Sequence, residues 1–359
     1  MTLKNLKKTY QGKKVFVTGH TGFKGSWMLY ILHLAGAKIK GYALAPERKN
    51  DLFNIIDGKQ ICESIIADIR DTKTLKKEIN SFQPDFIFHL AAQPLVRLSY
   101  EKPLETLEVN ALGTANLLEA VKDLKKACTV VLITTDKVYE NKEWIYPYRE
   151  NDRLGGHDPY SMSKACAELV ISSFRNSYFP LSKIKEHKKG IASARAGNVI
   201  GGGDWSTDRL IPDIAKALSN KKDIHIRNPL AMRPWQHVVE CIGGYLQLGA
   251  ALQKNPEKFS TAWNFGPTSL DNITVEMVLQ EFVEVWGKHS SKIKIEKATV
   301  HEAQFLSLDI SNTMYQLNWT PKYNWKQAVA ITAQWYREYH HRKVNINEVM
   351  QTSINQYFS

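Results

Sequence analysis

The stretch KVFVTGHTGFKGSWMLYILHLAG, residues 14–36, decides the fold. It begins with a short apolar, β-rich run over 14–18 and ends in a long apolar segment of helical character. Between them Gly19, Gly22 and Gly25 recur at intervals of three. A strand, a glycine turn and a helix in this order are typical of the first unit of a doubly wound α/β sheet.

The same alternation continues along the first half of the chain. Further strands are predicted over 38–44, 65–70, 84–92, 129–135 and 190–197, with helices over 72–81, 104–124 and 159–178. Because parallel neighbours need a crossover element, this alternation predicts a Rossmann-type, doubly wound parallel sheet. It breaks down after residue 197, so we expect a Rossmann domain over 1–197, with a returning segment near 236–262, and a smaller, mainly substrate-binding lobe over 198–359.

Composition limits the classes of function. The chain has 359 residues, 43% of them hydrophobic, and a formal net charge of +12. Its lysines are scattered without interleaved aromatic residues, which disfavours a nucleic-acid partner and favours solubility and steering of an anionic substrate. No window approaches a membrane-spanning length, and the basic N-terminus leads into a strand instead of a signal core, so we expect a cytoplasmic protein without membrane contact.

Four cysteines give no sign of a metal centre. Cys62, Cys128, Cys166 and Cys241 are far apart, and none forms a CxxC pair. We expect buried, reduced thiols and no bound metal.

The glycine turn indicates a dinucleotide site. Glycines at a first strand–helix junction allow a tight turn and close approach of a pyrophosphate, and the helix N-terminus favours its charge. The predicted contacts include Thr21 and Phe23 within the turn, and Asp68 and Ile69 at the end of the third strand. Asp68 could bind the adenine edge, although an ordinary loop carboxylate is nearly as plausible.

The loop after the second strand does not decide the cofactor. Glu47 would suit a ribose hydroxyl, whereas Arg48 and Lys49 would suit a 2′-phosphate. The choice between NAD and NADP therefore depends on the chemistry.

Three residues suggest that chemistry. Tyr160 and Lys164 lie four apart in DPYSMSKACAEL, on one face of a predicted helix. A nearby ammonium stabilises a phenolate, so the pair makes a tyrosine usable as a base. Thr135, at the end of the fifth strand in LITTDKVYEN, is placed to bind the same substrate hydroxyl, which completes a hydride-transfer triad.

Six motifs, in order between about residues 10 and 330, resemble the CDP-glucose 4,6-dehydratase family of the extended short-chain dehydrogenases: TGHTGFKG, HLAAQPLVRLSY, TTDKVYEN, YSMSK, ARAGNVIGGGDW and RNPLAMRPWQHV. The resemblance implies tightly held NAD, the triad roles given above and a place in bacterial deoxysugar synthesis for surface polysaccharide such as the lipopolysaccharide O-antigen. It also implies that Asn110 belongs to the active-site network and that the cofactor is lined by Leu90, Ala91, Ala92 and Gln93.

The resemblance implies a three-step reaction on CDP-glucose. Oxidation at C4 acidifies the C5 proton, water is lost across C5 and C6, and hydride returns to C6 to give CDP-4-keto-6-deoxy-D-glucose. Since the cycle is redox-neutral, retained NAD is preferred over NADP.

Asp136 and Lys137 follow the triad threonine, where elimination chemistry would lie. Asp136 could protonate the departing hydroxyl if its pKa were raised. Related dehydratases for other nucleotide sugars carry glutamate where this chain has Lys137. Lys137 could remove the C5 proton only as a neutral amine; alternatively it is a charged positioning group, and Tyr160 or Asp136 moves the proton.

The second half of the chain offers candidate substrate contacts. Arg209 and Arg233 would bind the pyrophosphate through bidentate guanidinium contacts. Asn198 could bind the phosphate or the sugar, and His237 could line the same cleft. Trp205 and Trp235 could pack on the base, although core packing is the better prediction for at least one of them.

Other readings stay open. The base of the nucleotide is not fixed, so a 4,6-dehydratase for another nucleotide sugar is one alternative. A nucleotide-sugar 4-epimerase or reductase would use the same triad without Asp136 and Lys137, and a nucleotide-binding regulator would keep the fold without turnover. We expect a homodimer through the helices over 104–124 and 159–178, although their apolar residues could equally form core: Leu117, Leu118, Leu169, Val170 and Ile171.

Overall fold

The glycine-rich stretch forms the first strand–turn–helix unit of the molecule. The structure is a computed structural model that describes residues 1–268, 273–296, 305–341 and 344–359. Strand β1 (Lys14–Thr18) leads through the glycine turn into helix α2 (Phe23–Leu34). Most of α2 is buried, which explains why its sequence is apolar on all sides.

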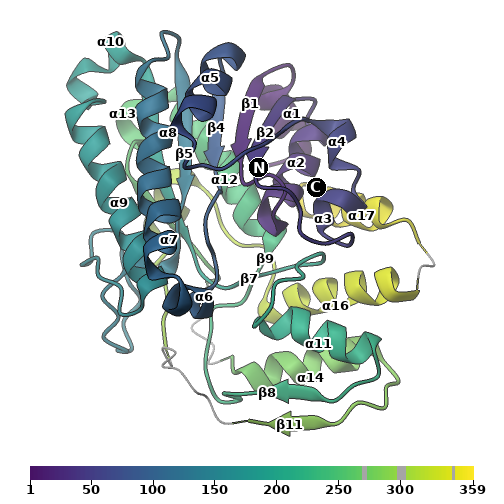
Figure 1. The fold of residues 1–359 in the computed structure, drawn as a ribbon. Coiled ribbons are helices and arrows are strands. Elements are labelled where there is room, and N and C mark those ends of the chain that lie inside the picture. Colours follow the sequence, from purple (N-terminus) through teal and green to yellow (C-terminus); the bar gives the residue numbers. More distant parts are fainter. Residues whose placement is uncertain (269–272, 297–304, 342–343) are drawn as a thin grey trace.

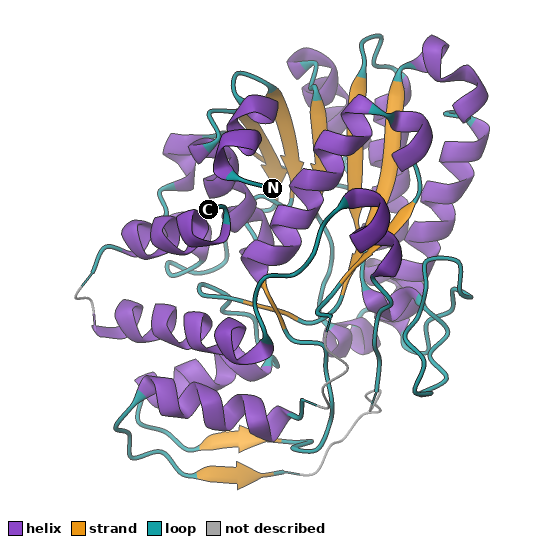
Figure 2. Cartoon of the chain, turned by 180° about the vertical axis from the view of Figure 1, so that it is seen from behind, coloured by secondary structure: helices purple, strands orange, loops and turns teal. Residues whose placement is uncertain are grey.

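Seven parallel strands form the main sheet, in the order β10-β6-β5-β4-β1-β2-β3 (Figures 1 and 2). The chain adds β2 and β3 on one side of β1 and the other strands on its opposite side. This confirms the predicted doubly wound Rossmann-type sheet, whose ligands bind outside the strands' carboxyl ends where the order reverses, between β1 and β4. The strands after β1 are β2 (Lys38–Ala43), β3 (Glu63–Ile66), β4 (Phe86–His89), β5 (Cys128–Ile133), β6 (Lys189–Ala196) and β10 (Ala262–Phe265).

Helices cover both faces of the sheet (Figure 1). Side chains of a strand alternate between faces, so Val15 and Val17 join one hydrophobic layer and Phe16 the other. The first layer contains α1 (Leu3–Tyr10), α2 and α12 (Val238–Lys254). The second contains α5 (Thr72–Phe82), α8 (Gly113–Lys122) and α9 (Pro159–Ser177).

Most of the apolar residues predicted for a subunit interface belong to this second layer. Leu117, Leu118 and Ile171 are buried in it, whereas Leu169 is 58% exposed and Val170 is partly buried. These helices therefore build the core of the monomer first.

A smaller lobe lies beyond one end of the sheet, below it in Figure 1. It contains α11 (Leu210–Ser219), α14 (Val275–Trp286) and α16 (Trp325–His341), with the parallel pair β8 (Ile224–Ile226) and β11 (Ile293–Ile295). A second short pair, β7 (Val199–Ile200) and β9 (Gln236–His237), joins the two parts. After residue 197, α12 and β10 return to the main layers; the division of the chain into domains stays a prediction.

The helix predicted over 104–124 is divided into α7 (Pro103–Leu107), a π-helical turn (Glu108–Leu112) and α8. The 3-10 turns span Asp136–Val138 and Leu181–Lys183. The remaining helices are α3 (Leu52–Ile55), α4 (Gly58–Ile61), α6 (Val96–Glu101), α10 (Ile184–His187), α13 (Pro256–Phe259), α15 (Ser311–Leu317) and α17 (Ile346–Tyr357).

The described part of the chain shows neither a membrane-spanning helix nor a metal-binding cluster. None of its helices combines the length and apolar character that a membrane span needs. Nor do its His, Cys, Asp and Glu side chains form a group of three that could hold a metal ion. Of the cysteines, Cys128 and Cys241 are buried, but Cys62 and Cys166 are partly exposed, contrary to the expectation that all four are buried.

Candidate active site

The glycine turn forms a cradle at the carboxyl end of β1. Gly19 has a φ of +73°, and a Cβ there would lie 2.6 Å from the backbone nitrogen of Ala91. A Cβ on Gly25 would collide with the Gly19 carbonyl oxygen. Gly22 begins α2 without a side-chain cap, which leaves N–H groups of the first turn to bind an anion. The turn therefore fits the pyrophosphate of a dinucleotide.

Side chains of the turn fix it to the sheet. Thr21 Oγ1 donates a hydrogen bond of 2.8 Å to the carbonyl of Leu44, and the ring of Phe23 lies against the loop over 201–203. His20 is buried, with Nε2 2.7 Å from a serine hydroxyl of β3. Burial lowers the pKa of His20 to about 4, so the imidazole is neutral near pH 7. Thr21 and Phe23 thus use their side chains to hold the turn in place.

Asp68 follows β3 and is held by Arg70. The guanidinium of Arg70 contacts both carboxylate oxygens, at 2.7 Å for the shortest pair. These hydrogen bonds hold the pKa of Asp68 below its usual value. The neighbouring Ile69 is buried against Gly113 at the start of α8. The Asp68 carboxylate therefore forms an ion pair with Arg70 at the edge of the sheet. The Ile69 side chain packs against the start of α8.

The segment over 90–93 leaves the carboxyl end of β4 beside the glycine turn. Its first two N–H groups donate to Thr18, at 3.1 Å to the carbonyl and 3.2 Å to Oγ1. Gln93 N donates to Asn110 Oδ1 at 2.8 Å, and Asn110 Nδ2 donates to Ser163 Oγ at 2.8 Å. Asn110 lies in the π-helical turn, a feature that often marks functional sites. It links the segment beside the turn to α9.

The three triad residues come together where β5 ends. Thr135, Tyr160 and Lys164 are all buried, and the Tyr160 hydroxyl shares a hydrogen bond with that of Thr135. Burial raises the pKa of Tyr160 to about 12, while the Thr135 hydroxyl acts to lower it. The α6 residue Ser99 accepts the Tyr160 N–H at 3.0 Å and so fixes the start of α9.

Lys164 differs from the sequence-based expectation in its partner. Its Nζ donates to the Ile133 carbonyl at 3.0 Å, so its direct contact is with β5 and not with the phenol. Burial lowers the pKa of Lys164 to about 8. The Lys164 amine is therefore fixed to the end of β5, and it can gain or lose its proton near neutral pH.

Asp136 lies beside the triad and is 3% exposed. Its Oδ1 accepts a hydrogen bond of 2.9 Å from Thr135 Oγ1. Burial raises the pKa of Asp136, against the opposing charges of Lys137, Arg233 and Lys24. A carboxyl group in these surroundings can hold a proton and release it to a nearby leaving group.

Lys137 occupies the middle of the 3-10 turn. Its backbone N–H donates to Thr135 Oγ1 at 3.3 Å, and its side chain is only partly buried. Its role as the C5 base stays a prediction.

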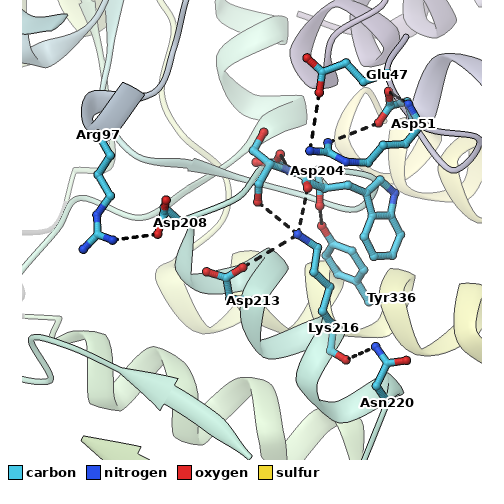
Figure 3. Close-up of polar contacts among 12 residues, drawn as sticks. Glu47, Asp51, Arg97, Asp204, Asp208, Asp213, Lys216, Asn220 and Tyr336 are labelled. Atoms are coloured by element: carbon cyan, nitrogen blue, oxygen red, sulfur yellow. Dashed lines mark hydrogen bonds and ion pairs between the residues drawn. The ribbon is translucent and has the colours of Figure 1, made fainter. Parts of the chain in front are cut away.

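The loop over 204–209 carries the first candidate substrate contact. Tyr336 OH donates to the Asp204 carbonyl, and Lys216 Nζ donates to the Trp205 carbonyl at 2.9 Å (Figure 3). Arg209 Nη1 lies 3.0 Å from Asp204 Oδ2, and its charge also lowers the pKa of Tyr160. The fixed loop therefore holds Arg209 near the triad.

Arg233 and Asn198 belong to the segments that lead into β9 and β7. Arg233 donates to the Met232 carbonyl at 2.8 Å and acts on the pKa of Asp136, which places it beside the centre. Asn198 joins β9 through its carbonyl, which accepts the Gln236 N–H at 3.1 Å. Their roles in substrate binding stay predictions.

His237 does not line the cleft as the sequence suggested. It is 1% exposed, its Nδ1 caps α12 by accepting the Val239 N–H at 3.3 Å, and its ring packs between Trp27 and Tyr323. Burial lowers the pKa of His237 to about 3. The predicted substrate contact was wrong because the side chain turns inward to begin a helix.

The two tryptophans are both largely buried. Trp205 packs against Tyr336 and Tyr339 of α16. Trp235 lines a cavity together with Arg233. Trp205 is thus a packing residue in the loop that carries Arg209, and Trp235 lies beside Arg233 in the lining of that cavity.

Sequence reasoning overlooked Lys24, within the glycine motif. Its charge interacts with Cys241, Arg209 and Asp136, which come from three separate elements, and burial lowers the pKa of Lys24. A lysine in the first turn of an apolar helix opposes the helix dipole, and this conflict was the available signal.

A buried ion pair behind the site was also overlooked. Glu168, one turn after Lys164, accepts hydrogen bonds from Arg195 Nη2 at 2.9 Å, Ser193 Oγ at 2.8 Å and Thr134 Oγ1 at 2.5 Å. It ties α9 to β5 and β6. In the sequence, the only sign of this ion pair is that Glu168 lies four residues after Lys164, on the same face of the helix.

Comparison with known proteins identifies the family. Residues 16–332 match the family model described as GDP-mannose 4,6 dehydratase. A CDP-glucose 4,6-dehydratase of Salmonella typhimurium is 49% identical over 331 residues, which are 92% of this chain and 92% of that protein. The chain belongs to the CDP-glucose 4,6-dehydratase family. A human dTDP-D-glucose 4,6-dehydratase is more distant, at 25% identity over 94% of each chain.

Solved structures of other nucleotide-sugar enzymes share the fold of this dehydratase. A dTDP-glucose 4,6-dehydratase of Streptomyces venezuelae, with NAD and TYD bound, has a TM-score of 0.76 at 23% identity and covers 93% of this chain and 99% of its own. A UDP-glucose 4-epimerase of Thermotoga maritima with UDP-glucose has a TM-score of 0.77 at 20% identity, covering 91% and 99%. At these identities the likeness concerns the fold alone.

Proposed function

We propose that this protein uses NAD to convert CDP-D-glucose into CDP-4-keto-6-deoxy-D-glucose and water. The observation that carries the proposal is the buried Asp136 hydrogen-bonded to Thr135, which in turn contacts Tyr160. A hydride-transfer pair and an acid for elimination are thus adjacent. The 49% identical relative supports the choice of substrate.

The residues present fit NAD. The glycine cradle suits its pyrophosphate, and the segment over 90–93 passes beside it. Arg48, a possible 2′-phosphate contact, lies 3.7 Å from a Glu47 oxygen and 3.8 Å from an Asp51 oxygen, so its charge is already compensated. This favours NAD over NADP. When bound, NAD would accept a hydride from the sugar and later return it.

Tyr160 serves the first step as the base at the C4 hydroxyl. Its ordinary pKa is too high for this, and burial raises it further, to about 12. The Thr135 hydroxyl and the charge of Arg209 oppose that rise. Lys164, fixed to the Ile133 carbonyl, supplies a titratable amine in the same buried layer. Tyr160 acts as a base only as the phenolate, and the Thr135 hydroxyl and the Arg209 charge are the groups that favour that form against burial.

Asp136 serves the elimination as the acid at the C6 hydroxyl. Its raised pKa lets it carry the proton, and Thr135 orients it through the 2.9 Å hydrogen bond. Lys137 is the candidate base at C5. Tyr160 or Asp136 would move this proton instead if Lys137 only positions the sugar.

The exposed parts of the dimer helices support a homodimer. Leu112 and Leu169 are 55% and 58% exposed, and Leu104 and Tyr178 are also exposed. Apolar side chains of this size gathered on neighbouring helices are typical of subunit interfaces. Sedimentation at micromolar concentration should give twice the monomer mass of 41.0 kDa.

The function is tested by incubating the purified protein with CDP-glucose and with the dTDP, UDP and GDP hexoses. Mass spectrometry should show loss of water from CDP-glucose, with alkali-induced near-ultraviolet absorbance of the keto product. Isomerisation without mass loss would favour a 4-epimerase instead. Absence of turnover with any sugar would contradict the proposal and favour a nucleotide-binding regulator.

A further inference from the structure

Two arginines from different parts of the fold meet on one carboxylate. Arg97 Nη1 lies 3.0 Å from Asp208 Oδ1, and Arg227 Nη2 lies 3.2 Å from the same oxygen. Arg97 belongs to α6, beyond the carboxyl end of β4, and Figure 3 shows it reaching across to Asp208. Arg227 directly follows β8 in the smaller lobe. The three side chains therefore connect the sheet to that lobe.

This cluster is close to the candidate active site by two routes. The α6 residue Ser99, two positions after Arg97, accepts the backbone N–H of Tyr160 at 3.0 Å. On the other side, Arg209 directly follows Asp208 and acts electrostatically on Tyr160. Arg97 and Asp208 thus belong to two segments that adjoin Tyr160, one through its backbone and one through the charge of Arg209.

The cluster has spare capacity for an anion. The charges of Arg97, Arg227 and Asp208 sum to +1, and the neighbouring Asp213 carboxyl has its own cation in Lys216, at 3.9 Å. The side chains of Arg97, Arg227 and Asp208 are 30%, 27% and 44% exposed, so a ligand can reach them. Two guanidinium groups offer about ten N–H donors, and one carboxylate oxygen uses only two of them here. A diphosphate offers more oxygens and more charge, in the geometry that guanidinium binds in a bidentate way.

We propose that Arg97 and Arg227 bind the diphosphate of the nucleotide-sugar substrate and that Asp208 is the carboxylate this group displaces. The identity of the anion rests on the proposed function. Because Asp208 competes for both arginines, singly charged anions bind poorly, and the site is kept for ligands with at least two adjacent negative charges. Asp208 tolerates its left-handed backbone, with a φ of +58°, better than most residues would.

The test measures CDP binding by calorimetry with the variants Arg97→Gln, Arg227→Gln and Asp208→Asn. Each arginine variant should weaken CDP binding about tenfold or more, because a charge-assisted contact is lost. It should raise KM for the nucleotide sugar while kcat changes little. Asp208→Asn should instead strengthen CDP binding, since the competing charge is removed. Arg153→Gln, at an exposed ion pair with Glu140, is the matched control and should change neither quantity.

The variants separate this proposal from a structural bridge and from the cofactor site. If Asp208→Asn weakens CDP binding as the arginine variants do, the cluster only ties the lobes together and the proposal is wrong. If the arginine variants lose NAD binding and keep CDP binding, the arginines serve the cofactor and the proposal is again wrong. Calorimetry needs no turnover, so arginine-dependent CDP binding without dehydration of any sugar would support this site and contradict the proposed function.

Discussion

Removing the charge of Glu168 should destabilise the protein by about 3 to 5 kcal/mol. Glu168 and Arg195 are each only 4% exposed at the side chain, and their closest atoms are 2.9 Å apart. Glu168→Gln keeps the shape and can keep the contacts with Thr134 and Ser193. It leaves Arg195 as a buried charge without its counter-ion, and the cost of that charge dominates the expected loss.

Urea unfolding followed by tryptophan fluorescence at pH 7 measures this loss. Glu119→Gln is the control, because its pair with Lys122 is exposed and should contribute less than about 1 kcal/mol. Adding Arg195→Met to Glu168→Gln should recover much of the stability, since the unpaired charge is removed. A loss below about 1 kcal/mol for Glu168→Gln alone would refute the reasoning.

The pH dependence of that loss is a further part of the same prediction. Burial would raise the pKa of Glu168, but Arg195 and the hydroxyl contacts outweigh it and hold the pKa below its ordinary 4.5. A carboxylate with a lowered folded-state pKa stabilises the protein above its unfolded pKa, and the effect fades as pH falls through the folded value. The difference between the parent and Glu168→Gln should therefore shrink in acid.

Three other predictions concern the acid, the glycine turn and a buried carboxyl group. Asp136→Asn should lower kcat by about 10² to 10⁴, while CDP-glucose still exchanges its C5 proton with deuterated solvent; a change below about tenfold would contradict the acid role. Gly19→Ala should abolish NAD binding, measured by fluorescence titration, because the new methyl group meets the backbone of Ala91; unchanged affinity would argue against the cradle. Burial raises the pKa of Glu240 from 4.5 to about 7, so stability should fall by roughly 3 kcal/mol as pH rises through that range, and Glu240→Gln should remove this slope in urea titrations.

The fold could be predicted because its signals are local. The β1–turn–α2 unit and the alternation after it follow from hydrophobic period and glycine spacing. The strand expected over 65–70 was less well placed, since β3 spans Glu63–Ile66 and the chain turns at Ile69 and Arg70, directly after Asp68. The π-helical turn could not be found, because it spans only Glu108–Leu112 and lies within one continuous segment of helical character. That turn is the element that carries Asn110 to α9.

Parts of the site could be predicted only where the interacting residues lie in one segment of the sequence. Tyr160 and Lys164 share a helix, but the partner of Glu168 is Arg195 on β6, and no spacing along the chain reveals that contact. The same holds for the surroundings of Asp136, which Lys24 approaches from a different element. Burial favours the protonated acid, and the nearby cations stabilise the carboxylate that remains after the proton has left. Asp136 is therefore equipped for both sides of one proton transfer, which is the property that an elimination of water requires.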